Sequence, residues 1–218
     1  MPEVIINGPE GRLEAKYHHA KTNAPVAVIL HPHPEDGGTM NDKVTYALYR
    51  TFSQNGFNTL RFNFRGVGKS EGIFDEGEGE LSDAASVLDW LQAHNPNAPA
   101  SWVGGFSFGA WIAMQLLMRR PELDGFVAVN PPADSKDFTF LAPCPVSGLF
   151  IQGADDKIVK PESVTTLAKT LTAQRNIYIT DKQVEGADHY FTNKLKNIMT
   201  LTQDYLEAGH QQAIAKSA

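Results

Sequence analysis

The chain has 218 residues, of which 42% are hydrophobic and 20% are charged. This composition supplies enough apolar side chains for a buried core and excludes intrinsic disorder as the state of the whole chain. The 25 acidic residues outnumber the 19 Lys and Arg residues, which gives a formal net charge of −6. That sign is unfavourable for binding a phosphate backbone, so we expect no nucleic-acid partner.

The cysteine content and the apolar stretches indicate in which cellular compartment the protein is expected. The single cysteine, Cys144, excludes an intrachain disulfide and a thiol-based zinc site, which is typical of a reducing compartment. The most apolar stretch, residues 104–118, is interrupted by Ser107 and Gln115, and the N-terminus lacks a signal-peptide pattern. We therefore expect one cytoplasmic domain, residues 1–218, with no membrane partner, metal or cofactor. The sequence leaves open whether the chain forms a homodimer.

Short apolar runs alternate with amphipathic segments from residue 26 onward, which predicts strand–helix–strand units around a largely parallel sheet. Residues 4–20, which precede this part, are typical of an antiparallel strand pair. The predicted strands are Val26–Leu30, Asn58–Phe64, Ser101–Gly104, Phe126–Val129, Val146–Gln152 and Ile177–Gln183. The predicted helices are Val44–Asn55, Leu81–His94, Phe108–Arg119, Glu162–Ala173 and Tyr190–Leu206. Residues 208–218 are expected to fray.

The pentapeptide Gly105-Phe106-Ser107-Phe108-Gly109 lies between a predicted strand and a predicted helix. A sharp turn at Ser107 requires small flanking residues, because larger side chains would strike the neighbouring strand and helix. The amino end of the helix also supplies free N–H groups that favour a developing oxyanion. Glycine-rich turns precede helices in many α/β proteins, so the pattern indicates a nucleophile only if a base and an acid follow.

Two later loops supply an acid and a base in the expected order. The loop Gly153–Val159 follows an apolar strand and carries Asp155 and Asp156, and His189 follows the last predicted strand. Loops at the carboxyl ends of parallel strands meet at one edge of the sheet, so these side chains are expected near Ser107. We expect five other histidines to be surface or core residues: His18, His19, His31, His94 and His210.

With these motifs the chain resembles the α/β-hydrolase superfamily, in particular its small bacterial members without a cap domain, similar to the dienelactone hydrolase group and related carboxylesterases. The resemblance covers about residues 25–206. It implies an α/β-hydrolase fold: a mostly parallel, doubly wound sheet with helices on both faces and no cap domain. True dienelactone hydrolases have a cysteine where this chain has Ser107.

The resemblance also assigns the acid and the base. The acid motif of the superfamily, G-x-x-D-x-x-V, fits Gly153–Val159 with Asp156 as its aspartate, so Asp156 is preferred to Asp155. The histidine motif, G-A-x-H, fits Gly186–His189. The expected triad is therefore Ser107, Asp156 and His189.

The loop His31–Met40 directly follows the first predicted parallel strand and resembles the oxyanion loop of the superfamily. One oxyanion donor should be the N–H of the residue after the nucleophile, Phe108, and the other an N–H from this loop. Proline has no N–H, so among residues 32–34 only His33 can donate. Phe108 and Tyr190 are also expected to line the substrate pocket, because they adjoin catalytic positions in the sequence.

The segment Phe64–Gly72 is rich in glycine but does not match a nucleotide-binding P-loop, because Asn63 stands where the first glycine is required. Arg65 is expected to pair with a buried carbonyl or carboxylate and to take no catalytic part. Glu35 and Asp36 are expected to be solvated loop acids that bind no metal.

The residues and the resemblance together predict a serine hydrolase that cleaves small-molecule carboxylic esters of small to medium acyl groups through an acyl-enzyme. Ser107 would attack the carbonyl, His189 would transfer the proton, and Asp156 would orient His189. A peptidase, an amidase or a thioesterase could use the same triad. The alternative from another class is a non-catalytic binding protein on the same scaffold, which would be expected to have lost a triad member.

Overall fold

The computed structural model describes residues 3–217, with side chains as far as Gly209, and in this part of the chain eight strands form one sheet. The strands are β1 (Glu3–Gly8), β2 (Gly11–His18), β3 (Val26–Leu30), β4 (Asn58–Phe62), β5 (Ser101–Phe106), β6 (Gly125–Val129), β7 (Gly148–Gly153) and β8 (Ile179–Val184). Their order is β1-β2-β4-β3-β5-β6-β7-β8. The β1–β2 and β2–β4 pairs are antiparallel, and the other pairs are parallel. The predicted mostly parallel sheet is confirmed.

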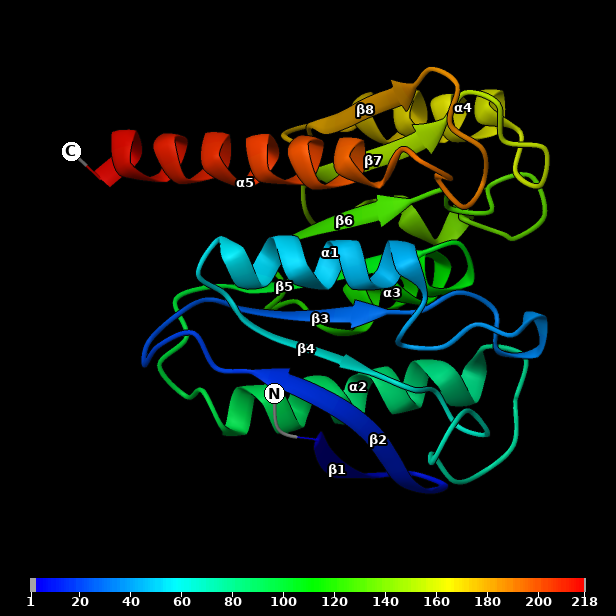
Figure 1. Cartoon of the computed structure of the whole chain (residues 1–218). Coiled ribbons are helices and arrows are strands. Elements are labelled where there is room, and N and C mark those ends of the chain that lie inside the picture. The colour runs from blue at the N-terminus through cyan, green and yellow to red at the C-terminus, as the bar shows by residue number, and fades with distance from the viewer. Residues whose placement is uncertain (1–2, 218) are drawn as a thin grey trace.

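Helices cover both faces of this sheet (Figure 1). α1 (Lys43–Gln54) and α5 (Leu195–Ser217) lie on one face, and α2 (Glu78–Ala93), α3 (Phe108–Arg119) and α4 (Pro161–Thr172) lie on the other. Two single-turn 3₁₀ helices, η1 (Pro34–Asp36) and η2 (Thr139–Leu141), lie in connections. Within residues 3–217 no inserted helices form a cap domain, as the sequence predicts.

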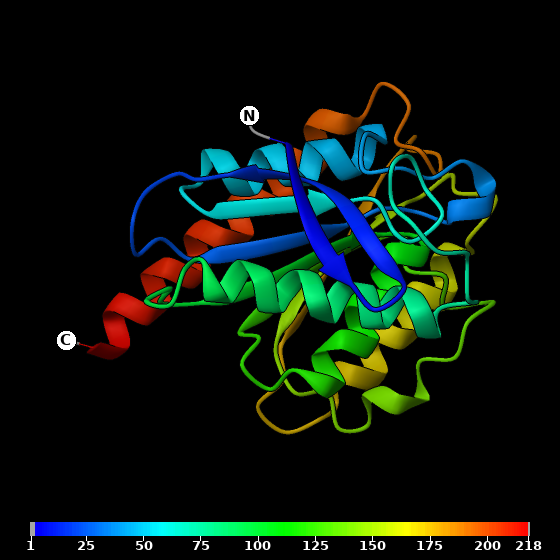
Figure 2. The same cartoon turned by 90° about the horizontal axis from the view of Figure 1, so that it is seen from below.

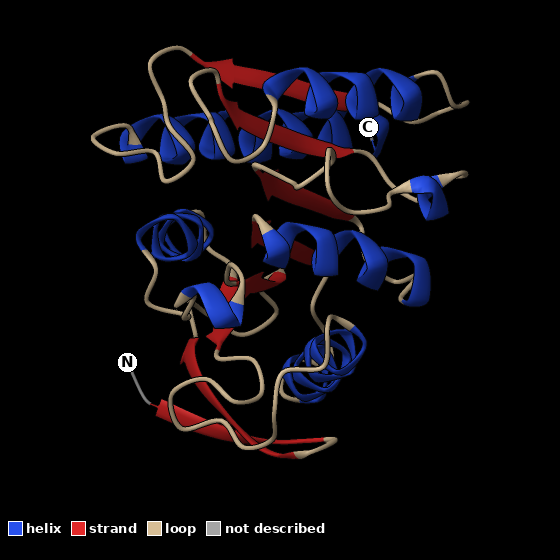
Figure 3. Cartoon of the chain, turned by 90° about the vertical axis from the view of Figure 1, so that its right-hand side faces the viewer, coloured by secondary structure: helices blue, strands red, loops and turns tan. Residues whose placement is uncertain are grey.

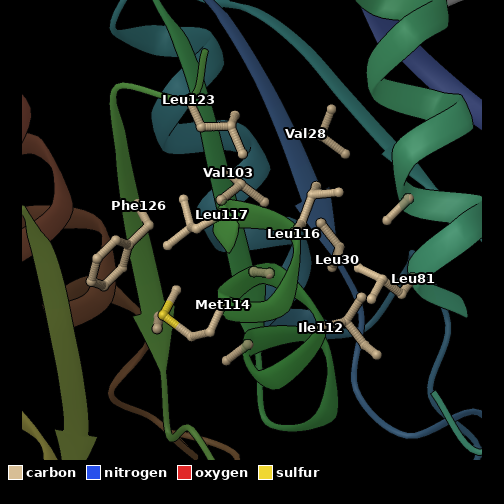
Figure 4. Close-up of a cluster of buried hydrophobic side chains, with 14 of the residues drawn as sticks. Val28, Leu30, Leu81, Val103, Ile112, Met114, Leu116, Leu117, Leu123 and Phe126 are labelled. Carbon is tan, nitrogen blue, oxygen red and sulfur yellow. The ribbon is translucent and has the colours of Figure 1, made fainter. Parts of the chain in front are cut away.

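The core consists of two apolar layers, one on each face of the sheet. Figure 4 shows the larger layer, where Val28, Leu30 and Val103 of the strands lie beside Ile112 and Leu116 of α3. Every residue of β3, β4, β6 and β7 is buried, as expected for strands that are covered on both faces. This rigid centre leaves the loops at the strand ends as the place for functional side chains.

The C-terminal region differs from the sequence-based prediction. The last helix begins at Leu195 and not at Tyr190, because Phe191 and Asn193 have φ angles of 52° and 59°, which interrupt a right-handed helix. The helix ends at Ser217 and extends past the sheet (Figures 1 and 2). The fraying of residues 208–218 stays a prediction. The final residue lies outside the described part.

The parallel strands β3 to β8 all end on the same side of the sheet, on the right in Figure 1 and toward the viewer in Figure 3. We call this side, with the loops that follow these strands, the carboxyl edge, and the opposite side the amino edge. The loops after β3, β5, β7 and β8 carry the four sequence motifs singled out above. The fold therefore brings these motifs to one edge.

Candidate active site

Ser107 lies on a strained turn between β5 and α3, and its side chain is partly exposed. Its φ and ψ angles of 52° and −119° fall outside the regions that residues with a Cβ usually occupy. Gly105 and Gly109 permit this turn. A Cβ on Gly105 would overlap the carbonyl oxygen of Gly109, and a Cβ on Gly109 would overlap that of His31. The structure thus contains the predicted strand–serine–helix turn.

His189 connects Ser107 to Asp156. Its Nε2 lies 3.2 Å from Ser107 Oγ, and its Nδ1 lies 2.7 Å from Asp156 Oδ2. A hydrogen bond from Nδ1–H to the carboxylate places the proton of a neutral imidazole on Nδ1 and leaves Nε2 free to accept the serine proton. The structure therefore brings the three predicted triad residues into one hydrogen-bonded chain.

The carboxylate of Asp156 is fully buried and held in place by the loop that follows it. Its Oδ1 accepts the N–H groups of Ile158 and Val159 at 2.8 Å and 2.9 Å. Asp155 is exposed and makes no hydrogen bond to His189 among the described side chains. The geometry supports the choice of Asp156 over Asp155.

The loop after β3 lies against the nucleophile turn. The rings of His33 and Phe108 pack edge-on with their centroids 4.9 Å apart. The backbone N–H groups of both residues have no acceptor among the residues that the structure describes, so they are free to bind a substrate oxyanion. Their role as the oxyanion hole stays a prediction. Glu35 and Asp36 in the same loop are exposed.

His31 is fully buried at the start of this loop and makes only structural contacts. Its Nδ1 lies 2.7 Å from the carbonyl oxygen of Pro32, and its Nε2 accepts the N–H of Phe64 at 3.0 Å. Burial lowers the pKa of His31 to about 3, so the imidazole is neutral at physiological pH. His31 thus fastens the loop to the end of β4 and is one of the core histidines that the sequence analysis expected.

Arg65 forms a bidentate ion pair with Asp83 of α2. Nη2 lies 2.8 Å from Oδ1, Nε lies 3.0 Å from Oδ2, and both side chains are almost completely buried. The hydrogen bond to Asp83 raises the pKa of the guanidinium. The predicted structural pairing of Arg65 is therefore present, and it attaches α2 to the loop after β4.

A cleft of ≈ 800 Å³ opens at the carboxyl edge, and it reaches the triad region through Tyr190, the neighbour of His189, while Ser107, Asp156 and His189 are not in its lining. One wall comes from residues between Gly37 and Lys43, and the other comes from residues between Tyr190 and Lys196. Tyr190 is exposed in this cleft, and its ring centroid lies 5.2 Å from that of His189. Its role in binding substrate stays a prediction. The Phe108 side chain is 2% exposed and packs in the core, so only its N–H remains available to a substrate.

Two buried amides at this edge escaped the sequence analysis, namely Asn130 after β6 and Gln152 near the end of β7. Their side chains bond to the loops that carry His189 and Asp156. The available signal was a polar residue at the carboxyl end of an apolar strand. That signal does not identify which loop the side chain will reach.

Other kinds of site find no support in the described residues. No group of His, Cys, Asp and Glu side chains in residues 3–209 is arranged to hold a metal ion. Nor does any described helix combine the length and apolar character that a membrane span requires. Cys144 is a free, buried thiol.

Comparison with known proteins assigns the family. A family model described as X-Pro dipeptidyl-peptidase (S15 family) matches residues 11–218. The chain belongs to the S15 peptidase family. Among solved structures, a protein of unknown function from Agrobacterium tumefaciens is 51% identical to this S15-family chain, with a TM-score of 0.94 and 97% of each chain covered. A serine hydrolase without a lid from Xanthomonas campestris is 31% identical, with a TM-score of 0.85 over 95% of this chain and 94% of that chain.

Curated relatives of this S15-family chain extend the comparison. An uncharacterized protein from Rickettsia prowazekii is 50% identical, over 94% of this chain and 89% of that protein. The rat lysophosphatidylserine lipase ABHD12 is 30% identical over 56% of this chain, but the match spans only 30% of the lipase. The predicted resemblance to α/β hydrolases without a cap is confirmed, and the chain is a member of a hydrolase family.

Proposed function

We propose that the protein is a serine hydrolase that cleaves carboxylic esters of small to medium acyl groups through an acyl-enzyme. The observation that carries this proposal is the unbroken hydrogen-bonded chain from Ser107 through His189 to Asp156. The similarity to a serine hydrolase without a lid supports it. A binding protein that had kept only the scaffold would not need all three side chains in hydrogen-bonded positions.

The mechanism follows from the positions of these groups. Ser107 Oγ attacks the ester carbonyl while His189 Nε2 takes its proton, and buried Asp156 stabilises the imidazolium that forms. The free N–H groups of Phe108 and His33 bind the tetrahedral oxyanion. His189 then protonates the leaving alcohol, and a water molecule deprotonated by the same imidazole releases the acid.

The second candidate is cleavage of X-Pro peptides, which the matching family model favours. A dipeptidyl-peptidase must recognise the ammonium group at the start of its substrate, and a buried or half-buried cation requires an opposite charge. Among the described residues that line the cleft, Lys43 and Lys196 are basic and Asp42 is acidic. Its Oδ1 already accepts the N–H groups of Val44 and Thr45. Within this cleft the charge pattern favours an ester over a peptide with a free amino terminus, although the exposed acids Glu35, Asp36 and Asp155 lie in neighbouring loops.

Parallel assays separate the two candidates. We expect p-nitrophenyl esters with short to medium acyl chains to be hydrolysed by the wild type and not by Ser107→Ala. We expect an X-Pro p-nitroanilide to be turned over with a far lower kcat/KM. A higher kcat/KM for the anilide would replace the ester proposal with the peptidase. Lack of turnover of both substrates by folded wild type would favour the binding protein.

A further inference from the structure

Two buried amide side chains lie behind the triad, at the carboxyl ends of the neighbouring strands β6 and β7. Asn130 directly follows β6, and Gln152 is the penultimate residue of β7. Both residues are 0% exposed. A polar side chain without access to water must find its partners inside the protein. These two find them in the loops that hold the base and the acid.

Asn130 joins the histidine loop to the acid loop. Its Nδ2 donates to the carbonyl oxygen of His189 at 2.7 Å, and its Oδ1 accepts the N–H of Gly153 at 3.0 Å. Its own N–H donates to the carbonyl oxygen of Ile151 at 2.9 Å, which fixes its backbone to β7. Its φ angle of 44° lies in the left-handed region, which asparagine adopts more readily than most residues. Both ends of the amide and its backbone are therefore held.

Gln152 holds the acid directly. Its Nε2 donates to Asp156 Oδ2 at 3.2 Å and to the carbonyl oxygen of Val159 at 3.3 Å. The same Oδ2 accepts the Nδ1–H of His189. The Oε1 atom of Gln152 is buried and has no hydrogen-bond partner in the described structure. A buried acceptor without a hydrogen bond lowers the stability of the folded protein. The presence of Gln152 is therefore better explained by its contact with Asp156 than by a contribution to stability.

We propose that Asn130 and Gln152 are positioning residues, which fix the distance and orientation of His189 relative to Asp156 during hydrolysis. This inference rests on the proposed serine-hydrolase function. Neither amide is bonded to Ser107, so both act through the base and the acid. The physical reason is the sensitivity of catalysis to geometry, since a displacement of about 1 Å can lower the rate on the order of 10²-fold.

The test compares Asn130→Gly with a matched control, Asn176→Gly. Glycine tolerates the positive φ at both positions, and Asn176 has a φ of 64° on an exposed turn. For Asn130→Gly we expect kcat for a p-nitrophenyl ester to fall about 10- to 100-fold while KM stays within about twofold. A looser Asp156–His189 bond stabilises the imidazolium less, so the acidic limb of the kcat/KM profile should move to lower pH. Asn176→Gly should match the wild type.

Gln152→Met supplies a second variant, because methionine has a similar length and removes the orphaned oxygen. We expect an unchanged or higher Tm together with a lower kcat, which a merely structural role would not produce. A fluorophosphonate should still label both folded variants to completion at Ser107, but at a lower rate. Wild-type kcat and an unshifted acidic limb in either folded variant would overturn the role of that residue. If the wild type neither turns over esters nor reacts with the fluorophosphonate, the proposed function fails and this inference fails with it.

Discussion

The two edges of the parallel sheet each carry a hollow of similar size, but their chemistry differs. The cleft at the carboxyl edge has a volume of ≈ 800 Å³, and the hollow at the amino edge has a volume of ≈ 850 Å³. Aromatic side chains line the amino-edge hollow, namely Phe57, Trp102, Tyr178 and Tyr205. The larger hollow is thus not the one at the carboxyl edge. The convergence of a serine, a histidine and an aspartate marks the candidate active site, and volume alone does not.

Topology explains why the three triad side chains meet at the carboxyl edge. Ser107, Asn130, Asp156 and His189 follow β5, β6, β7 and β8, which are neighbours in that order across the sheet. Adjacent strands lie about 4.8 Å apart, so side chains just beyond their ends can reach one another. At the amino edge, polar side chains such as Asn58 and Asp124 accept N–H groups of the backbone. Burial there raises the pKa of Tyr205 to about 12. We therefore expect the side chains at that edge to contribute to stability.

The largest loss of activity is expected from a substitution of Asp156 at the carboxyl edge. Asp156→Asn should lower kcat for ester hydrolysis by about 10⁴-fold, because the imidazole then loses its orienting carboxylate. Asp155→Asn is the matched control, and its exposed position predicts a kcat close to that of the wild type. Steady-state kinetics of both variants measure the difference. The reverse ranking would transfer the orienting role to Asp155.

The next largest effect concerns the backbone of the loop after β3, which is proposed to supply an oxyanion donor. His33→Pro removes the N–H and should lower kcat/KM by roughly 10²- to 10³-fold, the usual loss for one oxyanion donor. His33→Ala retains the N–H and should keep most of the activity. Circular dichroism must show that both variants are folded. Loss of activity in folded His33→Ala would show that the imidazole takes part.

A substitution at the amino edge should act on stability and not on chemistry. Trp102 packs edge-on against Phe57 and Tyr205, with ring centroids 6.3 Å and 6.2 Å apart. Trp102→Ala should lower the free energy of unfolding by roughly 3 kcal/mol, as measured by urea denaturation. The kcat/KM per folded molecule should stay within about twofold of the wild type. A far larger fall in kcat/KM would remove the contrast between the two edges.

The smallest effect distinguishes the buried His31 from His189, the proposed catalytic base. Its pKa is about 3 in the folded protein and about 6.5 in the unfolded chain. Below pH 6.5 the unfolded chain takes up a proton that the folded protein excludes, so stability is lost as pH falls toward 3. From pH 7 to pH 5 the loss should be about 2 kcal/mol. Urea denaturation of wild type and His31→Gln checks this, because the variant should lack that part of the pH dependence. Equal slopes for both proteins would contradict the burial of a neutral His31.

Most of the carboxyl edge could be predicted from the sequence because its motifs are local. The glycines on either side of Ser107, and the spacing from Gly153 to Asp156, specify turns within a few residues. Asn130 could not be found in this way, because it bonds to His189, 59 positions later in the chain. The predicted start of the last helix was wrong for a related reason. The left-handed turn at Phe191 depends on tertiary packing that periodicity does not contain.

The central claim is that only the carboxyl edge activates a serine, and fluorophosphonate labelling tests it most directly. Ser147, which lines the amino-edge hollow, provides the matched control for Ser107. We expect equal labelling of the wild type and Ser147→Ala, no labelling of folded Ser107→Ala, and a modified peptide that contains Ser107 by mass spectrometry. Labelling of Ser107→Ala at the wild-type rate would contradict the claim and remove Ser107 from the mechanism.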